Sequence, residues 1–122
     1  MKNLVKIFKA LSDPNRIRIL KMLEVRPLCV CEITDILNLA NSTVSKHLSI
    51  LKDVELIDDK KEGKWVNYHL NEKAQLQYAA QLQPLIKQWL TEAEQIHSDK
   101  IKVIHTNREF ICGISGHREY VA

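Results

Sequence analysis

A change of hydrophobic period near residue 55 constrains the fold of this chain more than any other feature. Before it, apolar residues recur at helical spacing, and Val44, Leu48 and Leu51 fall on one helix face. After it, residues 56–70 form two stretches rich in β-forming residue types, separated by lysines and a glycine typical of a hairpin turn. The sequence therefore predicts a helix followed directly by a short β-hairpin.

Three further helices are predicted before this one. The first places four apolar residues on one helix face: Leu4, Ile7, Phe8 and Leu11. Asp13 suits the N-cap of the second helix, with Pro14 at its first position, where a missing N–H costs nothing. The third begins close to Cys29, and residues 38–41 form the turn before the fourth. The predicted fold class is mainly α with a small β-hairpin, a winged helix-turn-helix.

A long helix is expected from Asn71 to about Ser98, kinked at Pro84. Its apolar positions are spaced 3, 4, 3, 4 and 3 residues apart, the heptad spacing by which helices pair: Ala79, Leu82, Ile86, Trp89, Ala93 and Ile96. Periodicity alone fits a dimer interface and a face of the chain's own core equally well. Residues 99–122 receive no assignment beyond a C-terminal tail.

Length and charge set the class of protein and permit an anionic partner. A chain of 122 residues suits one domain, and no apolar run approaches the roughly 20 residues that cross a bilayer. The start of the chain also lacks a secretory signal, so a cytoplasmic protein with no membrane partner is expected. Residues 1–70 hold 12 Lys and Arg against 9 Asp and Glu, whereas residues 71–122 hold 6 of each. An ordinary solvated surface explains this imbalance as well as an anionic partner does.

The order of helix, turn, helix and hairpin supplies the candidate partner. In a helix-turn-helix the second helix lies in the major groove of double-stranded DNA, with its N-terminal residues at the base edges. The polar residues of the fourth helix are therefore predicted to contact bases: Asn41, Ser42, Thr43, Ser45, Lys46 and His47. The hairpin lysines are predicted to contact the phosphate backbone: Lys60, Lys61 and Lys64. A solvated helix face, or a winged helix that binds only protein, remains an alternative.

Three passages, residues 8–20, 42–51 and 61–70, resemble the ArsR/SmtB family of bacterial metal-sensing repressors, and the resemblance covers roughly residues 4–98. It implies a homodimer built on the long N- and C-terminal helices, which binds an imperfect inverted repeat in the promoter of its own resistance operon. It also implies that residues 1–98 form the DNA-binding and dimerisation domain. Two residues depart from the pattern. Ala40 replaces a helix-capping serine, and Glu55 replaces a glycine, so a different turn geometry is expected there.

Residues 28–33, Leu-Cys-Val-Cys-Glu-Ile, resemble the thiol motif of the family's arsenic/antimony and cadmium/lead sensors. Two thiolates with a single residue between them form a chelate for a soft ion. On a regular helix, side chains two residues apart point about 200° from each other, so both sulfurs reach one ion only at a helix end or after local unwinding. Cys29 and Cys31 fall where the third helix should begin.

The resemblance implies arsenite or antimonite as the inducer, with Cd(II) or Pb(II) as the alternative, and no cofactor for DNA binding. One arsenic-sensing group takes a third sulfur from the position that Thr34 fills here, so Cys112 is the remaining candidate ligand. A redox sensor that uses the thiols is a further alternative. A disulfide-exchange enzyme is not expected, because the chain lacks a strand-turn-helix redox context. Polar residues near the C-terminus do not match the family's zinc or nickel sites: Glu94, His97, Asp99, His105 and His117.

Overall fold

The computed structural model describes residues 1–107 and begins with two short helices, α1 (Lys2–Leu11) and α2 (Pro14–Leu23). Asp13 caps α2 as predicted, since its carboxylate accepts hydrogen bonds from the backbone N–H of Asn15 at 2.8 Å and of Arg16 at 3.3 Å. Proline occupies the first position of the helix. The α1–α2 corner is therefore fixed by local chemistry that the sequence already displays.

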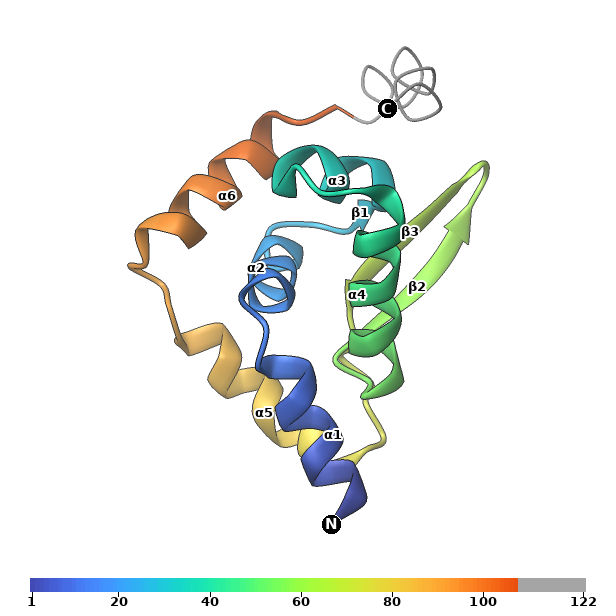
Figure 1. The fold of residues 1–122 in the computed structure, drawn as a ribbon, viewed down its shortest axis with the longest axis vertical. Helices are drawn as coiled ribbons and strands as arrows, with labels where there is room; N and C mark the ends of the chain where they lie inside the picture. The colour runs from blue at the N-terminus through green and yellow to red at the C-terminus, as the bar shows by residue number, and fades with distance from the viewer. Residues whose placement is uncertain (108–122) are drawn as a thin grey trace.

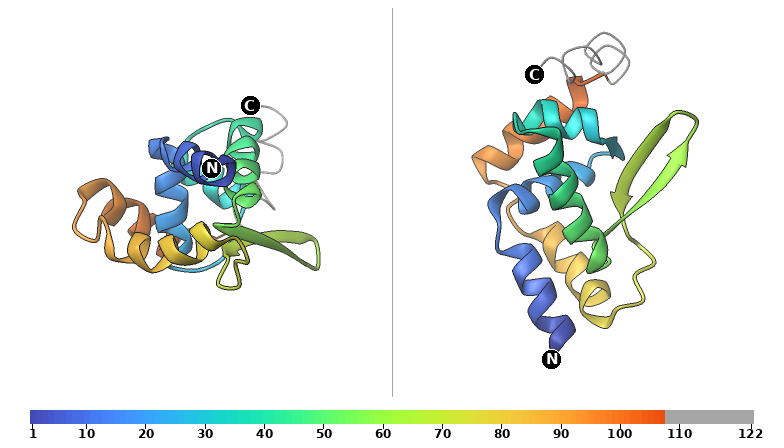
Figure 2. Two further views of the ribbon diagram at one scale, coloured as in Figure 1. Left: turned by 90° about the horizontal axis from the view of Figure 1, so that it is seen from below. Right: turned by 45° about the vertical axis from the view of Figure 1, so that its right-hand side comes forward.

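The next elements form a winged helix-turn-helix. They are β1 (Leu28–Cys29), α3 (Val30–Leu37), α4 (Asn41–Asp53), β2 (Ile57–Glu62) and β3 (Trp65–Leu70). Strands β2 and β3 form the predicted hairpin, which projects from the helical body (Figures 1 and 2). Strand β1 pairs antiparallel with the other side of β3, giving the strand order β1-β3-β2. A two-residue strand has too little pattern to predict, and it joins the start of α3 to the wing.

The prediction of one long helix over residues 71–98 is wrong, because two separate helices, α5 (Gln77–Gln88) and α6 (Glu94–His105), take its place. Asn71 accepts a hydrogen bond from the N–H of Lys73 in a local turn and does not cap a helix. After α5 the chain turns at Leu90, which has φ 61°. Helix α6 then lies beside α2 and α3. Helix α6 continues past residue 98, the predicted end of the DNA-binding and dimerisation domain. The division of the chain into this domain and a C-terminal tail remains a prediction.

The core receives buried apolar residues from each helix, α1 to α6, and from the base of the hairpin. Val44, Leu48 and Leu51 of α4 are fully buried, as their spacing predicts. Two residues of the predicted apolar faces are exposed at the surface of the chain: Phe8 is 56% exposed and Trp89 is 49% exposed. Helical spacing identifies an apolar face without saying whether the same chain covers it.

Helix α6 is held against α2 by polar side chains that sequence periodicity does not reveal. The guanidinium of Arg18 donates two hydrogen bonds, 2.8 and 3.0 Å long, to the carboxylate of Asp99, which is fully buried. This hydrogen bonding raises the pKa of Arg18 above its ordinary value. Lys100 also donates to Glu24 at 2.9 Å. No helix within residues 1–107 combines the length and apolar character needed to cross a bilayer.

Candidate nucleic-acid interface and thiol site

Helix α4 presents a polar face at its N-terminal end. Five of the six residues predicted to contact bases are exposed on its first two turns: Asn41, Ser42, Thr43, Ser45 and Lys46. Val44 and Leu48, both fully buried, fix the rotation of this face relative to the core. Ala40 occupies the N-cap without a side-chain hydrogen bond, as expected from its lack of a polar group.

His47 lies differently from the other five. It is half-buried, and its Nδ1 lies 3.1 Å from Nη1 of Arg16. Because a guanidinium only donates, Nδ1 accepts this hydrogen bond. Arg16 also donates to the carbonyls of Ala10 at 2.7 Å and Lys9 at 3.1 Å, so it connects the end of α1 to α4. Part of the predicted reading face is thus engaged within the protein.

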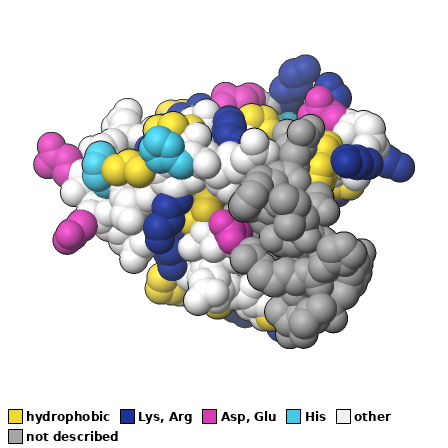
Figure 3. All heavy atoms as spheres, turned by 90° about the horizontal axis from the view of Figure 1, so that it is seen from above, with side chains coloured by type: hydrophobic (Ala, Val, Ile, Leu, Met, Phe, Trp, Pro, Cys, Tyr) yellow, Lys and Arg dark blue, Asp and Glu magenta, His cyan; other side chains and the backbone are white. Residues whose placement is uncertain are grey.

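The hairpin carries the three predicted lysines near its tip. Lys60, Lys61 and Lys64 are exposed, and Nζ of Lys64 lies 5.0 Å from the centroid of the Trp65 ring. The turn uses Gly63 at φ 62°, a conformation that glycine adopts without steric cost. Seen from the α6 end, Lys and Arg side chains gather at the edge occupied by the hairpin (Figure 3). The arrangement adds positive charge beside the polar face of α4.

The thiol pair lies at the start of α3. Cys29 has extended backbone angles, φ −89° and ψ 168°, and forms the N-cap, whereas Cys31 lies within the first turn. The two cysteines therefore do not occupy two positions of one regular helix, which meets the geometric condition for a shared ion. Cys29 also pairs with Asn67 of β3. One residue of the pair thus belongs both to the scaffold helix and to the sheet of the wing.

The two cysteines differ in burial and chemical state. Cys29 carries a buried thiol that is 3% exposed, whereas Cys31 is half-buried and disulfide-bonded. No bond therefore joins Cys29 to Cys31. Cys112 lies outside the described residues. Within residues 1–107 no cluster of three or more His, Cys, Asp and Glu side chains is arranged to hold a metal, so a three-donor site needs a ligand from elsewhere. Two sulfurs suit a thiophilic ion and do not complete its coordination.

A family model and a similar protein identify the class of protein. Residues 13–59 match the family model described as "Bacterial regulatory protein, arsR family". The arsenical resistance operon repressor of Escherichia coli K12 is 33% identical over 108 residues, which cover 84% of this chain and 82% of the relative. This chain belongs to the arsR family of bacterial regulatory proteins. The matched residues hold the helix-turn-helix and the thiol pair, and the chain is a transcriptional regulator, not an enzyme.

A further relative and a solved structure extend the likeness. A cadmium resistance transcriptional regulatory protein, a CadC homolog of Staphylococcus aureus, is 39% identical over 72 residues, covering 58% of this chain and 60% of the relative. The solved structure of reduced HlyU from Vibrio cholerae is 27% identical and superposes with a TM-score of 0.60, covering 75% of this chain and 92% of HlyU. The winged helix-turn-helix prediction is thereby confirmed.

The start of α3 in this arsR-family chain is also connected to α6, which sequence reasoning missed. Glu32 is 1% exposed, and its carboxylate accepts hydrogen bonds from the N–H of Cys29 at 3.0 Å and from Arg26 at 2.9 Å. The same nitrogen of Arg26 lies 3.1 Å from the carbonyl of Val103 and 3.2 Å from that of Thr106. The only sign of this connection in the sequence is a glutamate three residues after the N-cap, a spacing that fits a capping box.

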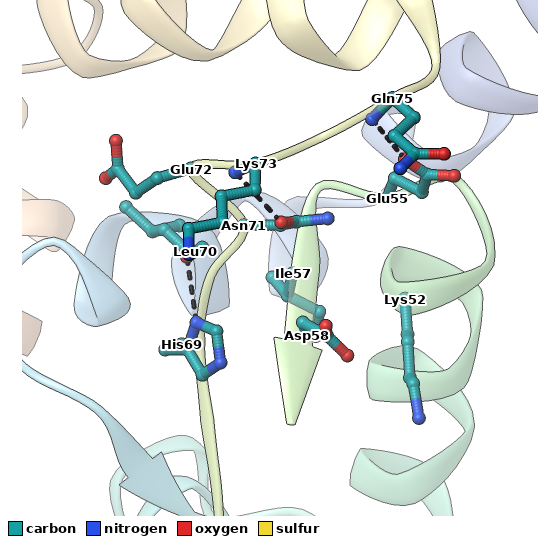
Figure 4. Close-up of a pocket in the computed structure, with 10 residues that line it drawn as sticks. All are labelled: Lys52, Glu55, Ile57, Asp58, His69, Leu70, Asn71, Glu72, Lys73 and Gln75. Carbon is teal, nitrogen blue, oxygen red and sulfur yellow. Dashed lines mark hydrogen bonds between the residues drawn. The ribbon is translucent and has the colours of Figure 1, made fainter. Parts of the chain in front are cut away.

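A cavity of about 630 Å³ lies at the base of the hairpin, and neither Cys29 nor Cys31 is among its lining residues (Figure 4). Several of its charged groups are already bound within the protein. Glu55 accepts from the N–H of Gln75 at 2.7 Å and Leu76 at 3.1 Å, and Lys52 donates to Asp59. Glu55 adopts φ 64°, the region glycine would use, so the different turn geometry expected there does not occur. Its side chain offsets the backbone strain by holding the segment before α5.

Two features of α6 bear on a zinc or nickel site and on dimerisation. Asp99 is bound by Arg18 and Gln95 and is therefore not available as a ligand, and His117 lies outside the described residues. Ile101 and Ile104 are 44% and 65% exposed. Together with Val5 and Phe8 of α1 they leave apolar side chains in solvent.

Proposed function

We propose that this protein is a homodimeric repressor that binds operator DNA and is released when a thiophilic metal or metalloid binds Cys29 and Cys31. The observation that carries the proposal is the position of Cys29, which is at once the N-cap of α3 and the partner of Asn67 in the wing. Because Cys29 is only 3% exposed, its sulfur must move to reach an ion. That movement disturbs the scaffold helix and the wing together.

DNA recognition is assigned to α4 and the hairpin. The exposed Asn41, Ser42, Thr43, Ser45 and Lys46 offer groups for base edges: asparagine pairs with adenine, threonine packs on the thymine methyl, and lysine donates to guanine or phosphate. His47 donates from Nε2, because its Nδ1 accepts from Arg16. The hairpin lysines Lys60, Lys61 and Lys64 neutralise phosphates and contribute affinity without sequence information.

Replacing Lys61 with glutamine is expected to weaken binding to specific and random DNA alike. Affinity falls as salt rises, and losing one phosphate contact makes the plot of log affinity against log salt less steep by about 0.9 per subunit. Fluorescence anisotropy with labelled duplexes at several salt concentrations measures this slope. Lys102→Gln, which removes an equal charge from the exposed surface of α6, serves as the control. Equal slopes for Lys61→Gln and the unmodified protein would exclude a phosphate contact by this lysine.

The exposed apolar residues of α1 and α6 favour homodimerisation. Val5 and Phe8 lie on the outer side of α1, and Ile101 and Ile104 lie on α6. Replacing Phe8 with serine is expected to raise the dimer dissociation constant about tenfold, since burying such a side chain contributes roughly 1.5 kcal/mol or more. Sedimentation velocity over a concentration series checks this, with Asn3→Ser on the same helix as the control. A monomeric native protein at micromolar concentration would contradict the proposal.

The inducer is assigned to the As(III)/Sb(III) class. These ions and their alternative, Cd(II) or Pb(II), prefer thiolates, and relatives named for arsenical and for cadmium resistance both match this chain. The thiols lie at the start of α3, where the helix dipole carries partial positive charge. Arg26 holds Thr106 beside the first turn of α3. Six residues later in the chain, Cys112 has a reach of up to about 20 Å and is proposed as the third ligand.

A redox-sensing repressor is the second candidate, and the state of Cys31 favours it. This sulfur is disulfide-bonded, which is the oxidised state of a thiol, and its reduction would return the thiol that an oxidant can convert to a disulfide again. Reduction of Cys31 must precede ion binding in the first proposal. In the second proposal, oxidation of Cys31 is itself the signal.

The deciding experiment is a titration of the reduced protein bound to DNA from upstream of its own gene. Arsenite, antimonite, Cd(II), Pb(II), Zn(II) and peroxide are added in turn while anisotropy reports bound DNA. Release by arsenite or antimonite supports the first proposal, and release by Cd(II) or Pb(II) alone assigns the alternative ions. Release by peroxide alone assigns the redox sensor. A protein that shifts no such DNA under any condition contradicts the assignment as a repressor.

A further inference from the structure

Arg26 lies where three elements meet and has contacts with two of them. It follows the end of α2 and donates to Glu32 of α3 at 2.9 Å. The same guanidinium nitrogen reaches the carbonyls of Val103 and Thr106 at the C-terminal end of α6. The last carbonyls of a helix have no partner within the helix and carry partial negative charge, so a cation there stabilises the helix end. Arg26 therefore holds the end of α6 against the beginning of α3.

Glu32 extends this contact to the thiol pair. Its two carboxylate oxygens have separate partners: Oε1 accepts from the N–H of Cys29 and Oε2 accepts from Arg26. At 1% exposure the carboxylate has little access to water as a replacement. If Cys29 or Arg26 breaks its hydrogen bond to Glu32, the buried carboxylate loses part of its stabilisation. The strength of its remaining hydrogen bond then changes as well. The position of Cys29 and the end of α6 are thus joined through two hydrogen bonds on one side chain.

We infer that Arg26 is a positioning residue which, through Glu32, transmits occupancy of the thiol site to α6. This inference rests on the proposed function and extends it from the helix-turn-helix to a second helix. When Cys29 moves toward an ion, its N–H leaves Glu32. The carboxylate then reorients, and Arg26 loses the geometry that lets it reach both Val103 and Thr106. Helix α6, with Ile101 and Ile104 on its exposed side, is loosened at its end.

Two substitutions separate this link from the sensor itself. Glu32→Gln keeps an oxygen for the N–H of Cys29 and places an amide where Arg26 needs a carboxylate. Arg26→Lys keeps the charge and removes the planar fork that contacts several acceptors at once. Arg18→Lys is the matched control, because Arg18 also fastens α2 to α6, through Asp99, without contacting Glu32. None of these residues is a proposed ion ligand or DNA contact.

The measurements are DNA affinity with and without sodium arsenite, arsenite binding followed by thiolate absorbance, and amide hydrogen exchange of residues 101–106. For the unmodified protein we expect arsenite to weaken DNA binding by about 5- to 150-fold. Arg26→Lys and Glu32→Gln should still bind arsenite, but their release factor, which is the factor by which arsenite weakens DNA binding, should be about fivefold smaller than that of the unmodified protein. Both variants should also speed exchange at the end of α6 before arsenite is added. Arg18→Lys should retain the full release factor.

Several results would overturn the inference, and they differ from failure of the proposed function. A release factor in Arg26→Lys and Glu32→Gln equal to that of the unmodified protein excludes the link. So does an equal loss in Arg18→Lys, which would assign the effect to general anchoring of α6. Unchanged exchange of residues 101–106 in Glu32→Gln excludes the link without any ion being present. If the unmodified protein keeps its DNA in arsenite while Glu32→Gln does speed exchange, the physical connection stands and arsenite sensing is wrong.

Discussion

Replacing Cys29 with serine is expected to leave the protein bound to its operator when arsenite is added. Serine is a favoured N-cap residue, so the start of α3 and its reciprocal contact with Glu32 should be kept or strengthened. DNA affinity without arsenite should therefore stay within about twofold of the unmodified protein. The hydroxyl does not replace a thiolate for a soft ion, so the coupling of about 1–3 kcal/mol between ion and DNA should be lost.

The measurement is the DNA dissociation constant with and without arsenite in a reducing buffer. Cys31→Ser is expected to lose release in the same way, and Cys112→Ser reports whether a third sulfur takes part. By linkage, DNA should weaken arsenite binding to the unmodified protein by the same factor by which arsenite weakens DNA binding. Release of the Cys29→Ser variant at the usual arsenite concentration would remove this cysteine from the sensor.

Replacing Leu48 with alanine is expected to lower the free energy of unfolding by about 2–5 kcal/mol. The side chain of Leu48 is fully buried in the centre of the face that joins α4 to the core. Removing it leaves a cavity behind the helix that presents the proposed base contacts. Because domains of this kind are stable by only about 5–15 kcal/mol, the variant should lose a large part of its stability.

Urea unfolding followed by circular dichroism measures this loss. Ser49→Ala changes the next residue of α4, which is exposed, and should shift stability by no more than about 0.5 kcal/mol. Operator affinity of Leu48→Ala should fall as well, measured at a temperature where the variant is still folded. An unfolding midpoint equal to that of Ser49→Ala would mean that α4 is not anchored by this residue.

The order of the DNA-binding elements was readable because each has a local signal. Asp13 and Pro14 mark a helix start, Val44 and Leu48 share one face, and a glycine with neighbouring lysines marks the hairpin turn. The proposed site residues on α4 were placed by the same means, since those between the buried positions must face outward. Five of the six are exposed, and His47 departs because Arg16, distant in sequence, holds its ring.

The arrangement after the hairpin was not readable from spacing. A heptad pattern runs from Ala79 to Ile96, yet the chain turns at Leu90 and α6 folds back on α2 and α3. Asp99 and Arg18 explain much of this return, because a buried carboxylate requires a cationic partner and finds one 81 residues away. Hydrophobic periodicity carries no information about such a pair. The exposure of Phe8 could not be predicted for a similar reason. Spacing shows that a residue lies on an apolar face, but not whether its own chain or another chain covers that face.

The sequence by itself determined the identity of the thiols, their place at the start of a helix, and the helix-turn-helix with its wing. These follow from caps, turn residues and periodicity, which act over a few neighbouring positions. Only the tertiary structure decided that Cys29 pairs with the wing through Asn67 and that Glu32 and Arg26 join it to the end of α6. The contacts of Cys29 with Asn67 and of Arg26 with Thr106 link residues far apart in the chain, and they form because buried polar groups must find partners wherever the packed core brings them together.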